Sequence, residues 1–442
     1  MPVWTFGLFI VLMNTTMFNV SIPSIIREIG VSASLGSWII SSYSIGYALS
    51  TMIYSRLSDV LPIRRLLTVG LVILGLASVF GIFVTDFQAI LFARIAQSAG
   101  AGVSAGLGLV IASRYIPYER RGRAISMISA GVAMAFGLGP IVGGLITEYI
   151  GWNGLFGFTS LVLVILPVLL RLLPKEQPKP FRFDMLGAVL TVVNAVAILT
   201  AVTQRSFFWL VVGIISIAAH IWHLSRKNES FINPKLFAEP MYRKLLFVGF
   251  SILVLNLGNL FMMPLVLANL FRDSPLIIGL IIAPGAVLSA FLTRFVGRWI
   301  DRYGNIRVLI LGHPILTLVL IVFWAILDTS PAVILFGFLF FSSAASASLS
   351  SLNNETSRIL PSNLIGSGMG FMQLIQFFGG SLSVAFCGML LDYLKNDSLV
   401  YSYEYVYAVL IAVSICSLFV LFRYLLSNHR SASLTDNEAR SN

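Results

Sequence analysis

The sequence predicts an all-helical protein that crosses a membrane many times. Of its 442 residues, 57% are hydrophobic and only 11% are charged, whereas about a quarter of the residues in a soluble domain are charged. So few charges cannot cover a water-facing surface of this size, and lipid must be the main solvent. The composition therefore argues against an aqueous enzyme, a nucleic-acid-binding protein and a secreted scaffold.

Apolar segments of helical length recur along nearly the whole chain. A transmembrane helix needs about 20 mostly apolar residues, and fourteen segments approach or exceed that length. The first six predicted spans are 3–25, 36–56, 66–85, 88–112, 124–147 and 154–173. A further pair covers 185–203 and 207–224, and the last six cover 243–270, 275–296, 307–327, 331–352, 365–391 and 405–426.

This grouping predicts the domain organisation. Residues 1–173 form an N-terminal six-helix bundle, and residues 241–427 form a C-terminal six-helix bundle. Residues 174–240 form a linker that contains an extra transmembrane hairpin, which we expect on the lipid side of the joint between the bundles. Residues 428–442 are polar and predict a disordered cytoplasmic tail.

Lysine and arginine are distributed unevenly between the predicted loops. With the N-terminus in the cytoplasm, only Arg27, Arg205, Arg272 and Lys395 of the 29 fall on the outer side, and only Arg94 falls within a span. Cytoplasmic loops of membrane proteins carry such an excess. The sequence therefore predicts a multi-pass protein of the cell membrane with both termini in the cytoplasm, and the net charge of +11 needs no nucleic-acid partner.

Residue types that build cofactor sites and catalytic centres are scarce. Cys387 and Cys416 lie in apolar segments and are interpreted as packing residues. The four histidines do not cluster, and no phosphate-binding loop occurs. We therefore expect no cofactor, no metal and no enzymatic activity. A membrane enzyme or receptor, the competing class, would need a cluster of His, Asp or Glu.

Two predicted cytoplasmic loops at equivalent positions share a pattern. Each has an acid at a helix end followed by arginines, and such groups can cap a helix or pair across a joint. An ordinary basic loop is the alternative at each site, but the recurrence favours a latch between two moving halves. The predicted gating residues are Asp59, Arg64 and Arg65 in the first loop, and Gly297, Asp301, Arg302, Gly304 and Arg307 in the second.

Small residues follow one face of the fifth span. Gly131, Ala135, Gly139 and Gly143 recur every fourth residue, which allows close helix approach in a membrane. Pro140 removes a backbone donor and can bend the helix. Plain helix packing and a gating hinge both explain the pattern.

Arg94 is the strongest single candidate for a functional residue within the spans. A permanent charge inside a span is expensive and usually functional, although an arginine near a helix end can also extend to the interface. Proton coupling normally needs a titratable group in the membrane, yet all 18 acids map to loops or span ends. Glu148 and His313 are the remaining candidates, with an interfacial acid and a locally bonded histidine as the alternatives.

Uncharged polar residues within the spans predict a neutral, mostly apolar substrate cavity between the two halves. Individually, each is as well explained as a link between helices. The candidates are Asn14, Asn19, Tyr43, Gln97, Asn256, Asn259, Gln373 and Gln376.

The sequence resembles the major facilitator superfamily. The second latch loop, Gly297-Arg-Trp-Ile-Asp301-Arg302-Tyr-Gly304, keeps the family pattern, whereas the first departs at Ser55, Val60 and Pro62. The stretches Tyr54 to Leu67 and Arg114 to Gly122 look closest to the tetracycline and multidrug exporters of Gram-positive bacteria, and further stretches resemble the fourteen-span drug:proton antiporter branch. These are 13–23, Ala93 to Gly100, and the span-5 antiporter motif with Gly139, Pro140, Gly143 and Gly144.

The resemblance implies proton-driven export of an amphipathic compound by a monomeric bacterial protein. It also implies a part for Arg94 in proton coupling. The expected carboxylates are missing, however, because Asn14, Thr15 and Gly380 occupy their positions. A multidrug exporter is therefore preferred to a tetracycline-selective one, and a facilitator that moves a small metabolite without protons stays open. The predicted partners are the substrate, protons and lipid, with no nucleic acid.

Overall fold

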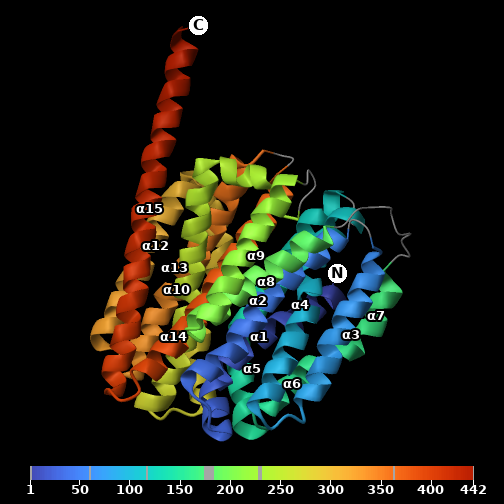
Figure 1. The fold of residues 1–442 in the computed structure, drawn as a ribbon, viewed down its shortest axis with the longest axis vertical. Helices are drawn as coiled ribbons and strands as arrows, with labels where there is room; N and C mark the ends of the chain where they lie inside the picture. The colour runs from blue at the N-terminus through green and yellow to red at the C-terminus, as the bar shows by residue number, and fades with distance from the viewer. Residues whose placement is uncertain are drawn as a thin grey trace.

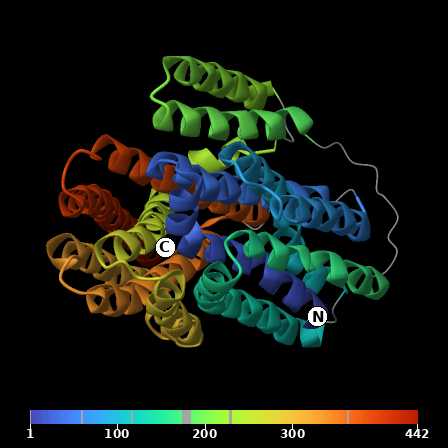
Figure 2. The same cartoon turned by 90° about the horizontal axis from the view of Figure 1, so that it is seen from below.

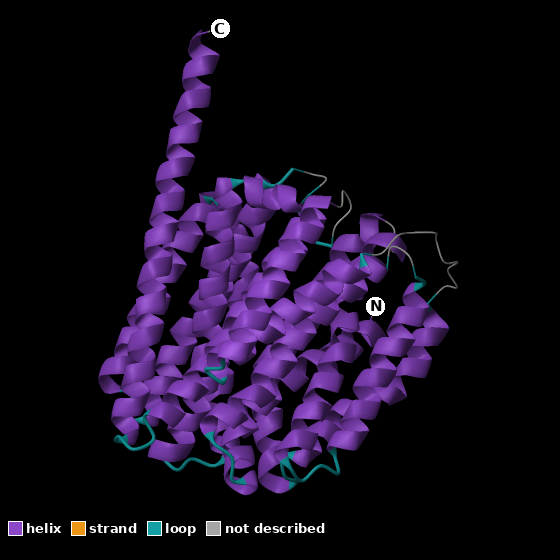
Figure 3. Cartoon of the chain, viewed as in Figure 1, coloured by secondary structure: helices purple, strands orange, loops and turns teal. Residues whose placement is uncertain are grey.

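The computed structural model describes residues 2–58, 61–115, 118–173, 184–226, 231–361 and 364–441. These residues form fifteen α-helices and one 3-10 helix, with no β-strand among them. The helices run between two opposite ends of the molecule, and the loops gather at those ends (Figure 3). The predicted all-helical fold is confirmed.

The helices fall into three sets along the chain. The first set is α1 (Pro2–Ile29), α2 (Ala33–Leu57), α3 (Ile63–Gly81), α4 (Phe87–Tyr115), α5 (Tyr118–Tyr149), α6 (Asn153–Ser160) and α7 (Val162–Leu172). The second is α8 (Met185–Thr203), α9 (Phe207–Arg226) and the 3-10 helix η1 (Pro234–Ala238). The third is α10 (Pro240–Leu270), α11 (Pro275–Tyr303), α12 (Asn305–Ile326), α13 (Pro331–Ile359), α14 (Ile365–Tyr393) and α15 (Leu399–Ser441).

Fourteen helical segments are long enough to cross a bilayer, because α6 and α7 are separated only by Leu161 and form one rod. Twelve of these segments are also apolar enough for a span within the residues that the structure describes, and α2 falls below that limit. In α2 the apolar character is lowered by buried serines such as Ser37, Ser41 and Ser44, and small polar residues of this kind favour close contact between membrane helices.

The outer surface of the helices is apolar. Phe83, Val164 and Leu318 expose 76%, 71% and 61% of their surfaces, and many other large apolar side chains are exposed beside them. A water-facing surface rarely carries such contiguous apolar patches. The exposed faces therefore match a protein surrounded by lipid.

Helices of the first set pack mainly with one another, as do helices of the third set, and the two sets lie side by side (Figure 1). Two seams join them, α2 against α14 and α5 against α11. We call the end with the α2–α3 and α11–α12 loops the basic end, after Arg64, Arg65, Arg302 and Arg307, and the opposite end the far end. The basic end is uppermost in Figure 1.

Helices α8 and α9 form a hairpin that stands outside both sets, as Figure 2 shows. Helix α8 touches α14 and, less extensively, α2. The hairpin therefore lies beside the α2–α14 seam.

Helices α11, α13 and α15 extend furthest beyond the predicted spans. Helix α11 continues to Tyr303 instead of ending at 296. Helix α13 continues to Ile359 instead of ending at 352, which places Glu355 and Arg358 in its last turns. Helix α15 continues to Ser441 and projects beyond the bundle (Figure 1), where the sequence predicts a disordered tail. Once a span has formed its first turns, each further residue adds a backbone hydrogen bond without a new nucleation cost.

Candidate functional site

A buried arginine lies inside the first helix set. Arg94, two turns from the start of α4, is 1% exposed. Its Nε donates to the backbone oxygen of Ile39 at 3.2 Å, and its Nη1 donates to Oδ1 of Asn14 and, at 3.0 Å, to Oε1 of Gln97. The side chain therefore does not extend to the interface, and neutral acceptors hold its charge.

Two aromatic rings complete the environment of Arg94. Its Cζ lies 4.0 Å from the ring centroid of Phe18 and 3.9 Å from that of Tyr43. A guanidinium over an aromatic face gains about 2 kcal/mol when it is desolvated. The two rings therefore stabilise the positive charge of Arg94, which lipid tails would not do.

The polar network continues outward from Arg94. Nδ2 of Asn14 donates to Oγ1 of Thr159 at 2.6 Å, and Nε2 of Gln97 donates to Oγ of Ser78 at 2.8 Å. These bonds link α1, α3, α4 and α6. Four predicted residues, Arg94, Asn14, Gln97 and Tyr43, thus come together at one place, and no carboxylate among the described residues pairs with the arginine.

Two predicted cavity residues serve as links within the third set. Oδ1 of the fully buried Asn259 accepts a hydrogen bond from the Tyr407 hydroxyl at 3.0 Å, which joins α10 to α15. Nε2 of Gln376 donates to Oδ1 of Asn353 at 3.1 Å, which joins α14 to α13. Both residues therefore act as links between helices, the alternative to a role in the substrate cavity.

The other predicted cavity residues lie apart from the Arg94 network. Asn19 is buried, and its Nδ2 donates to the backbone oxygen of Thr15 in the same helix at 3.1 Å. Asn256 and Gln373 are partly buried in α10 and α14.

The two titratable candidates have opposite surroundings. Glu148 is exposed in the last turn of α5, and the acceptors around Arg94 come from other residues. His313 in α12 is fully buried, beside the backbone of Ser414 in α15, and neither ring nitrogen has a hydrogen bond of good geometry among the described residues. Burial disfavours a charged imidazole, so proton uptake by His313 would need this site to open to water.

The span-5 motif packs on two neighbours at once. A Cβ placed on Gly139 would meet Oγ1 of Thr16, and one on Gly143 would lie 2.7 Å from Cα of Met17. Both contacts are with α1. Only glycine therefore permits this approach of α1 and α5.

The other face of the motif forms the seam with α11. A Cβ on Gly144 would lie 2.4 Å from the backbone oxygen of Pro275, and one on Gly279 would lie 2.3 Å from the backbone oxygen of Pro140. These residues lie toward the far end of both helices. The motif therefore joins the two helix sets there.

The seam between α2 and α14 is also closed toward the far end. The backbone N–H of Ser34 donates to Oδ2 of Asp392 at 3.1 Å, and Oγ of Ser41 donates to the backbone oxygen of Ser381 at 2.9 Å. Toward the basic end, by contrast, a Cβ on Gly370 would meet nothing within 4 Å. These seam contacts thus lie toward the far end of the two sets.

Adding one methyl group at Gly144 is a test of the close contact between α5 and α11. Gly144→Ala should lower the melting temperature and reduce transport, because the Cβ meets backbone atoms and overpacking costs about 1–3 kcal/mol. Gly370→Ala is the matched control, since it has open space and replacing a helical glycine stabilises by about 0.5–1 kcal/mol. Equal melting temperatures for the two variants would contradict the close contact.

No ion pair joins the two predicted latch loops among the residues that the structure describes. Asp59 lies outside the described residues, and Arg64 and Arg65 begin α3 with partly or fully exposed side chains. In the second pattern, Gly297, Asp301 and Arg302 lie within α11 and Arg307 lies within α12, so only Gly304 stands between the helices. All five of these residues are exposed, and Gly304 turns the chain with a φ of +83°.

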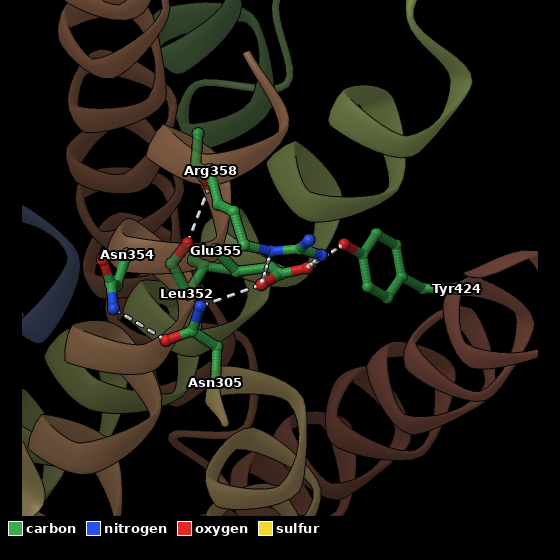
Figure 4. Close-up of polar contacts among 7 residues, drawn as sticks. Asn305, Leu352, Asn354, Glu355, Arg358 and Tyr424 are labelled. Atoms are coloured by element: carbon green, nitrogen blue, oxygen red, sulfur yellow. Dashed lines mark hydrogen bonds and ion pairs between the residues drawn. The ribbon is translucent and has the colours of Figure 1, made fainter. Parts of the chain in front are cut away.

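Sequence reasoning missed a buried carboxylate at the basic end (Figure 4). Glu355 of α13 is 1% exposed. Arg358 donates to it through Nε at 2.9 Å and Nη2 at 2.6 Å, Tyr424 through its hydroxyl at 2.6 Å, and Asn305 through Nδ2 at 2.9 Å. This cluster ties α12, α13 and α15 together. Its position at a helix end agrees with the prediction, but its burial does not.

One sequence signal could have found this position. Arg114, Pro117 and Gly122 follow the fourth span, and Arg358, Pro361 and Gly366 follow its counterpart at the same spacing. The pattern marks an equivalent helix end in both sets, at which only the second carries an acid three residues before the arginine.

Comparisons with known proteins place the chain in a family. The Major Facilitator Superfamily model matches residues 4–384. "Uncharacterized MFS-type transporter YcnB" of Bacillus subtilis (strain 168) is 25% identical over 404 residues, covering 89% of this chain and 85% of that protein. "Putative multidrug resistance protein MdtD" of Enterobacter sp. (strain 638) is 27% identical over 404 residues, covering 87% of this chain and 84% of that protein.

Solved structures share the fold at low identity. A POT family transporter in complex with a thioalcohol-conjugated peptide has a TM-score of 0.71 at 12% identity, with 96% of each chain covered. A D-xylose-proton symporter has a TM-score of 0.66 at 15% identity, with 95% of each chain covered. With the match over most of its length, the chain belongs to the major facilitator superfamily of membrane transporters.

Proposed function

We propose that the protein exports amphipathic drugs or toxic compounds in exchange for protons, by alternating access between two six-helix halves. The exported class rests on the relatives of this chain, some of which are named multidrug resistance proteins. The halves are residues 1–173 and 241–427, joined by the linker and hairpin of residues 174–240. All fourteen long segments cross the membrane in this proposal, as in the fourteen-span exporter branch.

The observation that carries the proposal is the Arg94 network. The membrane interior penalises a charge strongly, and here the charge meets only neutral acceptors and two rings. The energy of the buried Arg94 charge therefore changes when a negative charge enters its surroundings or a nearby group loses a proton. This supports a role in coupling rather than in packing.

The two seams support alternating access. Both hold the helix sets together toward the far end through small residues and backbone contacts. The excess of arginine and lysine orients the basic end, and both termini, toward the cytoplasm. The structure then corresponds to a state that is closed toward the outside, and the exposed latch loops would meet in the opposite state.

A transporter without proton coupling is the second candidate. It is favoured by the positions of the buried acids, because Glu355 and Asp184, the buried carboxylates among the described residues, both lie at the basic end. A tetracycline-selective exporter would fit the same fold but lacks its expected carboxylates. Proton movement distinguishes exporter from facilitator.

Inverted vesicles that contain the protein provide the test. With a pH gradient imposed across the membrane, an amphipathic cationic drug should release protons from the vesicle interior, and vesicles without the protein should not respond. Glu148→Gln and His313→Gln then identify the proton carrier, because the true carrier's variant should lose the pH dependence of transport. If a broad panel of drugs moves no protons while drug uptake continues, the facilitator is correct.

A further inference from the structure

The hairpin α8–α9 has a fixed position despite its place outside the bundle. Oδ1 of Asp184 accepts hydrogen bonds from the backbone N–H of Gly187 at 3.2 Å and from Nε2 of His223 at 2.8 Å. Oδ2 of Asp184 accepts one from the backbone N–H of Phe231 at 2.8 Å. One buried carboxylate thus joins both helices of the hairpin to the segment that leads into η1.

A cavity of about 910 Å³ lies between this hairpin, η1 and α14. Its walls are mostly apolar, and side chains of α14 form one of them. The apolar lining includes Ile198, Ile217, Ile221, Phe371, Leu374 and Phe378. A space of this size suits an apolar chain or ring system rather than an ion.

Asn194 and His220 are polar side chains in this apolar wall. Nδ2 of Asn194 and Nδ1 of His220 share a hydrogen bond of 3.0 Å, which joins α8 to α9. His220 is 5% exposed, and its Nε2 and Oδ1 of Asn194 are buried without a partner among the described residues. The pair therefore fixes the two helices of the hairpin at the cavity wall.

A cation stands at the mouth of the cavity. Lys235 of η1 lines the cavity and is exposed at the basic end. His220 lies six residues before the end of α9, which is about 9 Å deeper along the helix axis. The order from the interface inward is thus a cation and then a mostly apolar space.

We propose that this cavity binds an acidic glycerophospholipid from the leaflet at the basic end. The phosphate lies against Lys235, and an acyl chain occupies the apolar space between α9 and α14. A bound lipid of this kind would join the hairpin to α14. This inference concerns lipid binding and does not depend on which solute the protein transports.

The test compares two lipids with the same acyl chains and different head groups, one acidic and one zwitterionic. The purified full-length protein is titrated in mild detergent with phosphatidylglycerol or phosphatidylcholine of the same acyl chains, and bound lipid is counted by native mass spectrometry. Phosphatidylglycerol should bind about fivefold more tightly, the effect expected for one basic residue near an acidic head group. Equal binding of both lipids would overturn the proposal.

Two variants locate the site. Lys235→Gln should abolish the preference for phosphatidylglycerol, whereas Lys395→Gln, an exposed lysine at the far end, should preserve it. Ala195→Phe fills the cavity from α8 and should reduce the binding of both lipids, whereas Val196→Phe, on the exposed face, should not. If the lipid preference survives Lys235→Gln in a protein of unchanged melting temperature, the site lies elsewhere.

Discussion

Replacing Arg94 with methionine should abolish coupled transport without unfolding the protein. Methionine fills a similar volume but carries no charge. A buried charge without an opposite partner costs several kcal/mol of desolvation, and about 2 kcal/mol from each ring contact offsets part of that cost. We therefore expect the melting temperature of Arg94→Met to stay near that of the unmodified protein or to rise.

Transport should respond in the opposite direction. Drug-dependent proton release in inverted vesicles should fall by at least tenfold, which corresponds to about 1.4 kcal/mol of lost coupling free energy. Arg94→Lys should give an intermediate rate, because it keeps the charge but cannot reproduce the planar fork that serves Asn14, Gln97 and the backbone oxygen of Ile39.

Comparing the melting temperature with the transport rate distinguishes a coupling role of Arg94 from a packing role. Arg171→Met, an exposed arginine at the end of α7, should leave both quantities unchanged. If Arg94→Met lowers the melting temperature as strongly as it lowers transport, the arginine is a structural residue. If Arg94→Met transports normally, its proposed coupling role is wrong.

The spans could be predicted because each needs only local information. The predicted span 185–203 matches α8 at both ends, and most other spans differ from the observed helices by a few residues. Length and hydropathy set these limits. The larger differences occur at α11, α13 and α15, where the helix continues into polar residues that hydropathy assigns to loops.

The partners of the site residues could not be predicted because they come from distant parts of the chain. Asn14 and Arg94 are 80 residues apart, and Asn14 and Thr159 are 145 apart. Asn14, Tyr43 and Gln97 share a site, whereas Asn259 and Gln376, chosen by the same rule, bind neighbouring helices instead. Residue type alone does not distinguish these cases, since only helix packing decides which face meets which neighbour.

Glu355→Gln should cause the largest loss of stability among the changes considered. Oε1 of Glu355 accepts from Arg358 and Tyr424, and Oε2 accepts from Arg358 and Asn305. In either orientation the amide nitrogen of glutamine would face groups that donate to the carboxylate. Breaking a buried charged pair costs about 3–5 kcal/mol.

The cost should lie near the lower limit, because the Arg358 side chain is 56% exposed and can be hydrated when its partner is lost. A loss of about 3 kcal/mol corresponds to a melting temperature lower by roughly 5 °C for a chain of this size. Tyr424→Phe should give a smaller decrease, since it removes one hydrogen bond to a charged acceptor, worth about 1.5–3 kcal/mol, and leaves the ion pair intact.

The melting temperatures of purified variants, followed by intrinsic fluorescence, provide the measurement. Glu239→Gln is the matched control, because this acid is exposed at the same end of the bundle and should melt like the unmodified protein. The carboxylate joins α12, α13 and α15, so its loss should loosen these three helices relative to one another. A Glu355→Gln variant that melts with the Glu239→Gln control would mean that the cluster does not stabilise the third helix set.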